Sequence, residues 1–273
     1  MQYALVAEQR SAPFPKAKGV CPFCSGEMTA RCGKKKAWHW AHKPKRDCDP
    51  WWENETDWHR QWKSRFPEDW REVVHFDESG EKHIADVKTA DGVVFEFQNS
   101  PMSIDELNAR ESFYGNVIWI VNGKSFEKNF TILDRLPNPD AEFSQDIVFC
   151  QQTLNRPYFC YWRRSQNPHR RVGDMVRMLS PSEPGEEEIL SQIDEAYVGH
   201  HWFDWKHQRD VWLQSEQRVL IDFARADNLL VELTVYRDYP GYSPFCVQYV
   251  CGERLIESHG GKWTGDPSLN LHS

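Results

Sequence analysis

The sequence predicts a mixed α/β fold whose core is an α-β-β-β-α-β unit between residues 51 and 123. Three observations predict it: aromatic residues at helical spacing over 51–66, three short β-type runs after them, and a capped helix that leads into an apolar run. The 273 residues suffice for one large domain or two modest ones, and hydrophobic and charged contents of 40% and 27% are typical of globular proteins.

The first helix and strand of this core follow from residue spacing. Residues three or four apart form one face of a helix: Trp51, Glu55, Trp58, His59 and Trp62. Pro67 limits the C-terminal end of this helix because proline cannot continue it. Arg71–Phe76 then predicts a strand, and Ser79-Gly80 predicts the turn that ends it.

A hairpin and a helix–strand unit complete the core. Ile84–Val87 and Val93–Gln98 predict two strands joined near Asp91-Gly92. Ser103 predicts an N-cap, with acids in the first turn of a helix that continues to about Tyr114 and is closed by Gly115. The run 117–121 is apolar throughout, as expected of a strand buried on both faces.

The second half of the chain predicts a strand-rich region. A connector is expected at 136–140, and a polar linker at 181–188 leads into a short helix that ends near Ala196. Strands are predicted over 147–149, 158–162, 219–223, 229–233 and 241–251, and the last dozen residues are predicted to be irregular.

Two carboxylates and one amide are expected to converge on the hairpin. Side chains two apart on a strand share a face, so Glu96 and Gln98 point the same way, and Asp86 can lie across from them. Isolated carboxylates among β-branched and aromatic residues need a reason, because their burial is costly. Mg²⁺ prefers oxygen ligands in such an arrangement, so the hairpin predicts a site for Mg²⁺ or Mn²⁺.

The first 50 residues carry the spacing of a structural zinc site. Cys21 and Cys24 form a tight knuckle, and His39 and His42 follow at a distance that completes a tetrahedron. Cys48 competes with His39 as the fourth ligand, and Cys32 is a possible bystander. The alternative is a set of buried thiols beside a surface histidine pair. We predict bound Zn²⁺ that stabilises a segment too small for its own core.

Charge is distributed unevenly along the chain. Residues 1–50 hold ten Lys and Arg against four Asp and Glu, a net of +6, whereas the remainder has a net of −14 within the overall −8. Attraction to nucleic acid is therefore expected at the N-terminal module, around Lys34–Lys36, Lys43, Lys45 and Arg46. A solvated turn is the alternative for the lysine run. An acidic C-terminal half that binds other proteins is a further possibility.

Six motifs together resemble the competence protein CoiA-like family, whose core is similar to the PD-(D/E)xK (restriction-endonuclease-like) nucleases. They cover about the first 125 residues: the Cys21/Cys24 knuckle, HWAH at 39–42, ENETDWHRQWK at 53–63, HIADV at 83–87, FEFQNSPMS at 95–103 and VIWIVNG at 117–123. The resemblance implies three regions: a basic zinc-binding module at 1–50, a nuclease-like core at 51–135, and an α+β region of unknown role at 145–273.

Carried over to this chain, the resemblance implies that Asp86, Glu96 and the backbone carbonyl of Phe97 bind Mg²⁺, with Glu55 as an additional acid. Gln98 stands where the superfamily pattern has Lys, and an amide can only orient a water by hydrogen bonds. Lys88, on the face of Asp86, is a candidate for the missing charge. His59 either contacts the phosphate or pairs with Glu55, or it packs between Trp58 and Trp62.

The predicted function is metal-dependent hydrolysis of phosphodiester bonds, in DNA rather than RNA, within DNA processing, competence or defence against foreign DNA. The alternative is a catalytically inactive protein that binds DNA through the basic zinc module. No signal peptide and no membrane-spanning run are read from the sequence, so a cytoplasmic location is expected.

Overall fold

The computed structural model describes the chain except residues 35, 44–47, 54, 238–244 and 265–273. It is a strand-rich mixed α/β structure with two compact units. The first unit comprises Met1–Ile120 and a C-terminal segment that begins at Gly252; the second comprises Val121–Cys251. Within the described part of the chain, none of the helices has the length and apolar character needed to cross a bilayer.

The N-terminal part of the first unit is a five-stranded antiparallel sheet in the order β2-β1-β3-β4-β5. Its strands are β1 (Ala4–Val6), β2 (Gln9–Ser11), β3 (Lys18–Val20), β4 (Glu27–Arg31) and β5 (His39–His42). A small core lies beneath them: Met1, Ala4, Ala17, Cys21, Phe23, Met28 and Trp40. Three cysteines, Cys21, Cys24 and Cys48, belong to or border this core, so a metal bound by them would add to its stability.

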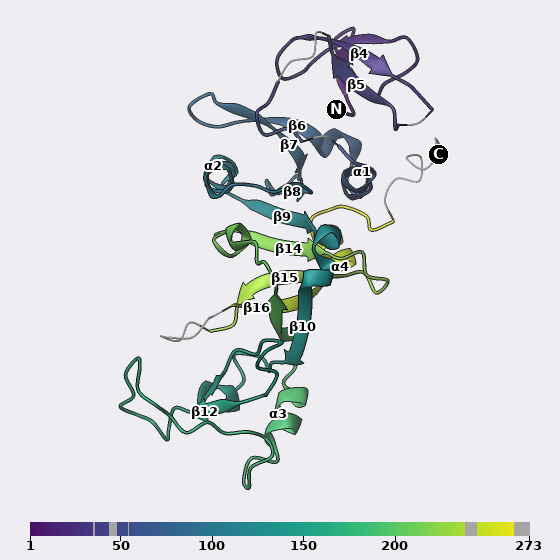
Figure 1. The fold of residues 1–273 in the computed structure, drawn as a ribbon. Coiled ribbons are helices and arrows are strands. Elements are labelled where there is room, and N and C mark those ends of the chain that lie inside the picture. Colours follow the sequence, from purple (N-terminus) through teal and green to yellow (C-terminus); the bar gives the residue numbers. More distant parts are fainter. Residues whose placement is uncertain (35, 44–47, 54, 238–244, 265–273) are drawn as a thin grey trace. The chain divides into compact units, whose positions relative to one another are not determined.

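The remainder of the first unit has the predicted order of elements (Figure 1). They are α1 (Asp57–Lys63), β6 (Arg71–Phe76), β7 (Lys82–Lys88), β8 (Val94–Gln98), α2 (Ile104–Tyr114) and β9 (Val117–Asn122). The strands lie in the order β9-β8-β7-β6, and the chain passes between β8 and β9 through α2. The α-β-β-β-α-β prediction for residues 51–123 is therefore confirmed at the level of element order.

Helix α1 begins later than predicted. Thr56 is its N-cap: the Thr56 hydroxyl accepts from the backbone N–H of His59, and the His59 ring accepts in turn from the backbone N–H of Thr56. This capping box fixes the first helical residue at Asp57, so Trp51 and Glu55 lie in the segment before the helix. The prediction that Glu55 is helical was wrong, because a local cap outweighed the aromatic spacing.

Strands β7 and β8 form the predicted hairpin, in which Val87 pairs with Phe95 and Lys88 with Val94. Gly92 in the turn has a φ of +85°, which glycine adopts without strain. Because side chains alternate along a strand, Phe95 and Phe97 face the α1 segment, where Trp62 stacks on Phe97. Glu96, on the other face, is contacted by Arg110 of α2.

Helix α2 has the predicted caps, since the Ser103 hydroxyl accepts from the backbone N–H of Glu106 and Gly115 ends the helix at a φ of +69°. The C-terminal segment adds α4 (Gly252–Ser258), which the sequence did not predict. After α4, the backbone N–H of Lys262 donates to the Arg65 carbonyl at 2.6 Å, and Trp263 contacts Trp62. This segment therefore packs beside α1.

The second unit is an antiparallel sheet with a separate hairpin (Figure 1). The strands of this sheet lie in the order β10 (Phe130–Arg135), β13 (His200–Trp205), β16 (Phe245–Cys251), β15 (Leu229–Val235) and β14 (Arg218–Asp222). The separate hairpin pairs β11 (Ile147–Phe149) with β12 (Tyr161–Arg163). The helix α3 comprises Ile189–Glu195. Strands β10 and β13 were not predicted. The predicted start of the last strand, 241–244, lies outside the described residues. Short 3₁₀ turns occur at Glu68–Trp70, Gly123–Ser125, Glu127–Asn129, Phe143–Gln145 and Asp210–Leu213.

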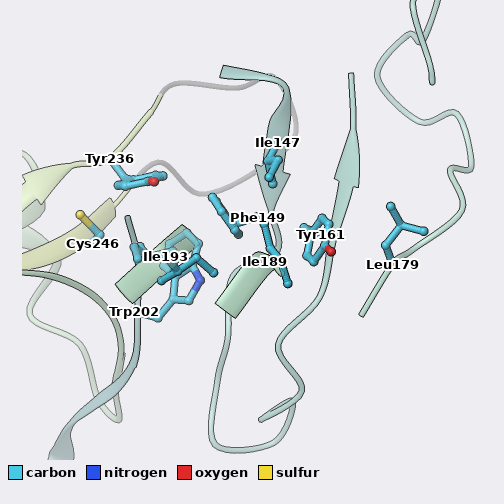
Figure 2. Close-up of a cluster of buried hydrophobic side chains, with 10 residues drawn as sticks. Ile147, Phe149, Tyr161, Leu179, Ile189, Ile193, Trp202, Tyr236 and Cys246 are labelled. Atoms are coloured by element: carbon cyan, nitrogen blue, oxygen red, sulfur yellow. The ribbon is translucent and has the colours of Figure 1, made fainter. Parts of the chain in front are cut away.

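Figure 2 shows the core that joins the hairpin and α3 to this sheet. Its buried members are Leu136, Ile147, Phe149, Tyr161, Leu179, Ile189, Ile193, Trp202, Tyr236 and Cys246. Burial of these large apolar side chains is the main stabilising contribution to the hairpin, which two short strands alone would not provide.

Candidate metal centres and acidic cavity

Four side chains of the N-terminal module form a cluster with the composition of a structural zinc site. The ligand atoms of Cys21, Cys24, His42 and Cys48 all lie within 4.8 Å of one another. Cys21 Sγ is 3.5 Å from Cys48 Sγ, and Cys24 Sγ is 3.3 Å from His42 Nε2. Three thiols and one imidazole are a standard tetrahedral donor set for Zn²⁺, so the cluster fits a closed zinc site.

His39 is not part of this cluster. The sequence left His39 and Cys48 as alternatives for the fourth ligand, and the structure places Cys48 there. Residues 39–42 form strand β5, in which His39 pairs with Arg31 and His42 with Met28. Side chains separated by an odd number of residues point to opposite faces of a strand, so His39 and His42 cannot both face one ion. The His39 ring contacts the Ala37 carbonyl at 2.9 Å instead.

Without a bound cation, the buried thiols of this cluster are held in their neutral form. Burial raises the pKa of Cys21, and burial together with the neighbouring thiols raises the pKa of Cys48. Thiolates in such a site need a positive charge nearby, which a zinc ion supplies. Of the predicted basic residues around this module, Lys35, Lys45 and Arg46 lie outside the described residues.

The predicted residues of the second metal site gather around one small cavity of about 30 Å³. Five carboxyl groups, two permanent cations and a histidine are among its lining: Glu53, Glu55, Glu72, Asp86 and Glu96, with Lys63, Arg110 and His59. Gln98 and Phe97 line it as well. Clustered carboxylate oxygens are the hard donors that Mg²⁺ binds.

Three of these acids come from three adjacent strands. Asp86 of β7 lies between Glu72 of β6 and Glu96 of β8, since Arg71 pairs with Val87, and Val87 with Phe95. The backbone N–H of Asp86 donates to Glu96 Oε1 at 3.2 Å, and the backbone N–H of Phe97 donates to Asp86 Oδ2 at 3.0 Å. The carboxyl groups of Asp86 and Glu96 therefore face a common space.

Glu72 has an unusual backbone conformation for a strand residue. Its φ is +48°, in the left-handed region, and its carboxylate accepts from the backbone N–H groups of Gln2 at 2.8 Å and Tyr3 at 3.3 Å. Such conformations cost about 1–3 kcal/mol in a residue other than glycine and persist only where the surrounding structure holds them. The other carboxylate oxygen, Glu72 Oε1, lies 3.5 Å from Lys63 Nζ, so Glu72 joins the acids around the cavity.

Lys63, the last residue of α1, places its ammonium group among three carboxylates. Lys63 Nζ lies 2.7 Å from Asp86 Oδ1, 3.3 Å from Glu55 Oε1 and 3.5 Å from Glu72 Oε1. Only 4% of the Lys63 side chain is exposed. Burial opposes its charge, but the three acids dominate and raise the pKa of Lys63 well above its usual value. Lys63 is therefore a permanent cation of the cavity.

Glu55 is held as a carboxylate at the edge of the same cavity. Its oxygens lie 2.7 Å from Arg60 and 3.3 Å from Lys63, and the Gln2 amide donates to it at 2.6 Å. Burial raises the pKa of Glu55, but the charges of Lys63 and Arg60 outweigh this effect and lower it to about 2.

Glu96 has the opposite electrostatic character. Burial and the nearby charge of Asp86 raise the pKa of Glu96 to about 8, although Arg110 lies 3.2 Å away. The Arg110 guanidinium is itself held by the Trp51 carbonyl at 2.7 Å and by Glu106. Two adjacent carboxyl groups whose negative charges repel are a frequent feature of sites that bind a divalent cation.

Gln98 is oriented by its neighbours. Its amide nitrogen donates to the Glu53 carboxylate and to the Ser100 carbonyl at 3.0 Å, and Ser100 Oγ donates to the same Glu53 oxygen at 2.6 Å. Because both partners are acceptors, the amide nitrogen must face them. The Gln98 carbonyl oxygen, which accepts no hydrogen bond from the described residues, is then available to accept one from water.

Lys88 has a partner other than the one proposed for it, whereas His59 makes one of the contacts proposed for it, with Trp58, and one that was not predicted, with Glu53. Besides its capping role, His59 has Nε2 3.7 Å from Glu53, rather than Glu55, and its ring lies edge-on to Trp58. Lys88 Nζ contacts His75 Nδ1 at 2.8 Å. Lys88 is not among the cavity residues, so the cation beside Asp86 in the structure is Lys63.

Sequence reasoning missed Lys63, Glu72 and Arg110. Lys63 follows His59 by four residues on one helix face, and Arg110 lies between the buried positions Leu107 and Tyr114 of α2. These spacings were available signals. The role of Glu72 had no local signal, because it depends on a contact with residues 70 positions earlier.

The comparisons with known proteins bear on the N-terminal module. Residues 12–50 match the family model described as Competence protein CoiA, N-terminal domain. A search of curated proteins found no match, and a search of solved structures found none. All four residues of the cysteine–histidine cluster lie inside the matched segment, whereas Asp86 and Glu96 lie beyond it. This module of the chain is thus similar to the N-terminal domain of competence protein CoiA.

Proposed function

We propose that this protein is a metal-dependent nuclease that hydrolyses phosphodiester bonds in DNA and acts in DNA processing linked to competence. The observation that carries the proposal is the single cavity that brings together Glu55, Asp86, Glu96 and Gln98. The N-terminal similarity to the CoiA domain supports the link to competence. The resemblance of residues 53–123 to the PD-(D/E)xK pattern supports the reaction class.

In this proposal Asp86, Glu96 and the Phe97 carbonyl hold Mg²⁺ or Mn²⁺. When bound, this ion supplies charge neutralisation at the phosphate and lowers the pKa of a coordinated water. Gln98 accepts a hydrogen bond from the attacking water and so orients it, while Glu53 and Ser100 fix the Gln98 amide. Lys63 provides the positive charge that Gln98 lacks, because its ammonium group lies beside Asp86.

The test is nicking of a supercoiled plasmid in zinc-containing buffer with and without Mg²⁺ or Mn²⁺. The parent protein is expected to nick only with the added ion, and Asp86→Asn and Glu96→Gln are each expected to abolish nicking. Glu78→Gln is the matched control, since Glu78 is an exposed carboxylate in the turn between β6 and β7. Circular dichroism and zinc content establish that each variant is folded.

Undiminished nicking by either Asp86→Asn or Glu96→Gln would remove this site from the mechanism. Loss of nicking in Glu78→Gln to the same degree would show that the effect of the other two substitutions is not local. Contaminating nuclease is excluded by the same two variants, because they are purified in the same way as the parent.

One observation favours a second function, namely DNA binding without catalysis. The oxygens of the acidic cavity already have protein partners: Lys63 and the Phe97 N–H contact Asp86, and Arg110 and the Asp86 N–H contact Glu96. A cluster balanced by internal cations can persist without an ion. Absence of nicking by the parent with every divalent cation, together with retained DNA binding, would favour this second function.

A further inference from the structure

A second and larger cavity, of about 890 Å³, adjoins the acidic cavity within the first unit. It is bounded by residues of β4 and β5, by the segment that precedes α1, and by the first turns of α1. Trp52, Glu55 and Ile84 line both cavities. A molecule in the larger cavity would therefore lie directly beside the carboxylates.

The wall that the N-terminal module contributes to this cavity carries two exposed cations, while the acids Asp49, Glu55 and Asp57 also line the cavity. Arg31 at the end of β4 and Lys36 in the following loop are both exposed, and neither forms an ion pair with any of the described residues. Arg60 of α1 also lines the cavity, where it contacts Glu55 at 2.7 Å. Exposed Arg and Lys side chains along a cavity are suited to phosphate groups.

The same cavity presents an aromatic surface. Trp52 is 45% exposed, although tryptophan is a large apolar side chain that is usually covered. Its indole lies where the two cavities meet. Cations that follow a backbone, combined with an exposed aromatic ring, are the features with which proteins bind single-stranded nucleic acid, because an unpaired base stacks on the ring.

We infer that the larger cavity binds a single nucleic-acid strand and delivers its backbone to the acidic cavity. The inference rests on the proposed nuclease function and adds its substrate class. Arg31 and Lys36 contact consecutive phosphates, Trp52 stacks on a base, and the next phosphodiester lies beside Glu55 and Asp86. A base in a duplex is not available for this stacking. The volume of the larger cavity lies in the range of sites for small ligands, so the cavity suits a short stretch of one strand.

The test measures binding separately from cleavage. Fluorescence anisotropy is recorded with a labelled 12-nucleotide strand, as DNA or as RNA, and with the corresponding DNA duplex, in the Asp86→Asn background at constant zinc. We expect either strand to bind more tightly than the duplex. The double variant Arg31→Ala/Lys36→Ala is expected to lower the magnitude of the slope of log K (the strand-binding constant) against log salt concentration by about 1.4. Trp52→Ala is expected to weaken strand binding roughly 5- to 150-fold.

Lys16→Ala/Lys18→Ala is the matched control, since both lysines are exposed in the same module and do not line the cavity. Equal or tighter binding of the duplex would overturn the inference, as would equal losses in the cavity and control double variants. Strand binding by a parent protein that does not cleave would retain the inference and refute the nuclease. Cleavage by a parent protein whose strand binding is insensitive to all three cavity substitutions would retain the nuclease function and refute the inference about the larger cavity.

Discussion

Replacement of Lys63 by Met should strongly destabilise the protein and should make its stability dependent on magnesium. Lys63 Nζ lies within 3.5 Å of Asp86, Glu55 and Glu72, and its side chain is 4% exposed. Removal of one partner from a buried ion pair typically costs about 3–5 kcal/mol, because the remaining charge is left uncompensated. Met keeps the length and apolar stem of the side chain, so the lost charge dominates the change in free energy of unfolding.

A divalent cation bound by the same carboxylates should recover much of this loss. At a concentration 100 times its Kd, a ligand specific for the folded state adds about 2.7 kcal/mol. The assay is urea unfolding, followed by tryptophan fluorescence, of the parent and Lys63→Met with and without Mg²⁺ at constant zinc. Mg²⁺ should stabilise Lys63→Met more than the parent, in which Lys63 already balances the acids.

Lys88→Met is the matched control, because Lys88 lies two residues from Asp86 on β7 but contacts His75 rather than the acids. It should change the free energy of unfolding far less than Lys63→Met. Equal stability of the parent and Lys63→Met without Mg²⁺, or an identical response of both to Mg²⁺, would refute the assigned role of Lys63.

Two other predictions follow from the structure. Cys48→Ala should lose bound zinc and unfold the N-terminal module, whereas His39→Ala should retain one zinc per chain. Elemental analysis measures the zinc content, and equal zinc in the two variants would contradict the assignment of Cys48 as the fourth ligand. In the second unit, burial lowers the pKa of His201 below its usual 6.5, while its ring contacts Tyr197 Oη at 2.6 Å and the Leu133 carbonyl at 2.8 Å. A lowered pKa means that the folded state binds the proton less tightly than the unfolded state, so this contribution to stability is complete above pH 6.5 and is lost as the pH falls. Urea unfolding between pH 7.5 and 5.5 should show a smaller decline in the free energy of unfolding for His201→Gln than for the parent. Equal declines in the two proteins would count against this role of His201.

Elements fixed by local signals were predictable from the sequence. The caps Ser103 and Gly115 bound α2, and Asp91-Gly92 predicted the turn between β7 and β8, because a cap or a tight turn depends on neighbours a few residues away. The start of α1 was missed although its signal was also local. The Thr56–His59 capping box was present in the sequence, but the spacing of the aromatic residues suggested a longer helix.

The candidate sites were predictable only in part. The knuckle Cys21–Cys24 and the pair Asp86 and Glu96 are recognisable as ligand types at suitable spacing. The choice of Cys48 over His39 required the knowledge that residues 39–42 form a strand. The positions of Lys63 and Glu72 depend on contacts between distant segments, which spacing along the chain does not reveal.

The segment immediately before β1 links the two candidate metal centres. Gln2 donates to both Glu72 and Glu55, and Met1, beside it, belongs to the small core that contains Cys21. Extraction of zinc would loosen this core and with it two acids of the other centre. Inhibition by EDTA would then be ambiguous, since it would report loss of either ion. A magnesium requirement has to be established by omission and re-addition of magnesium alone.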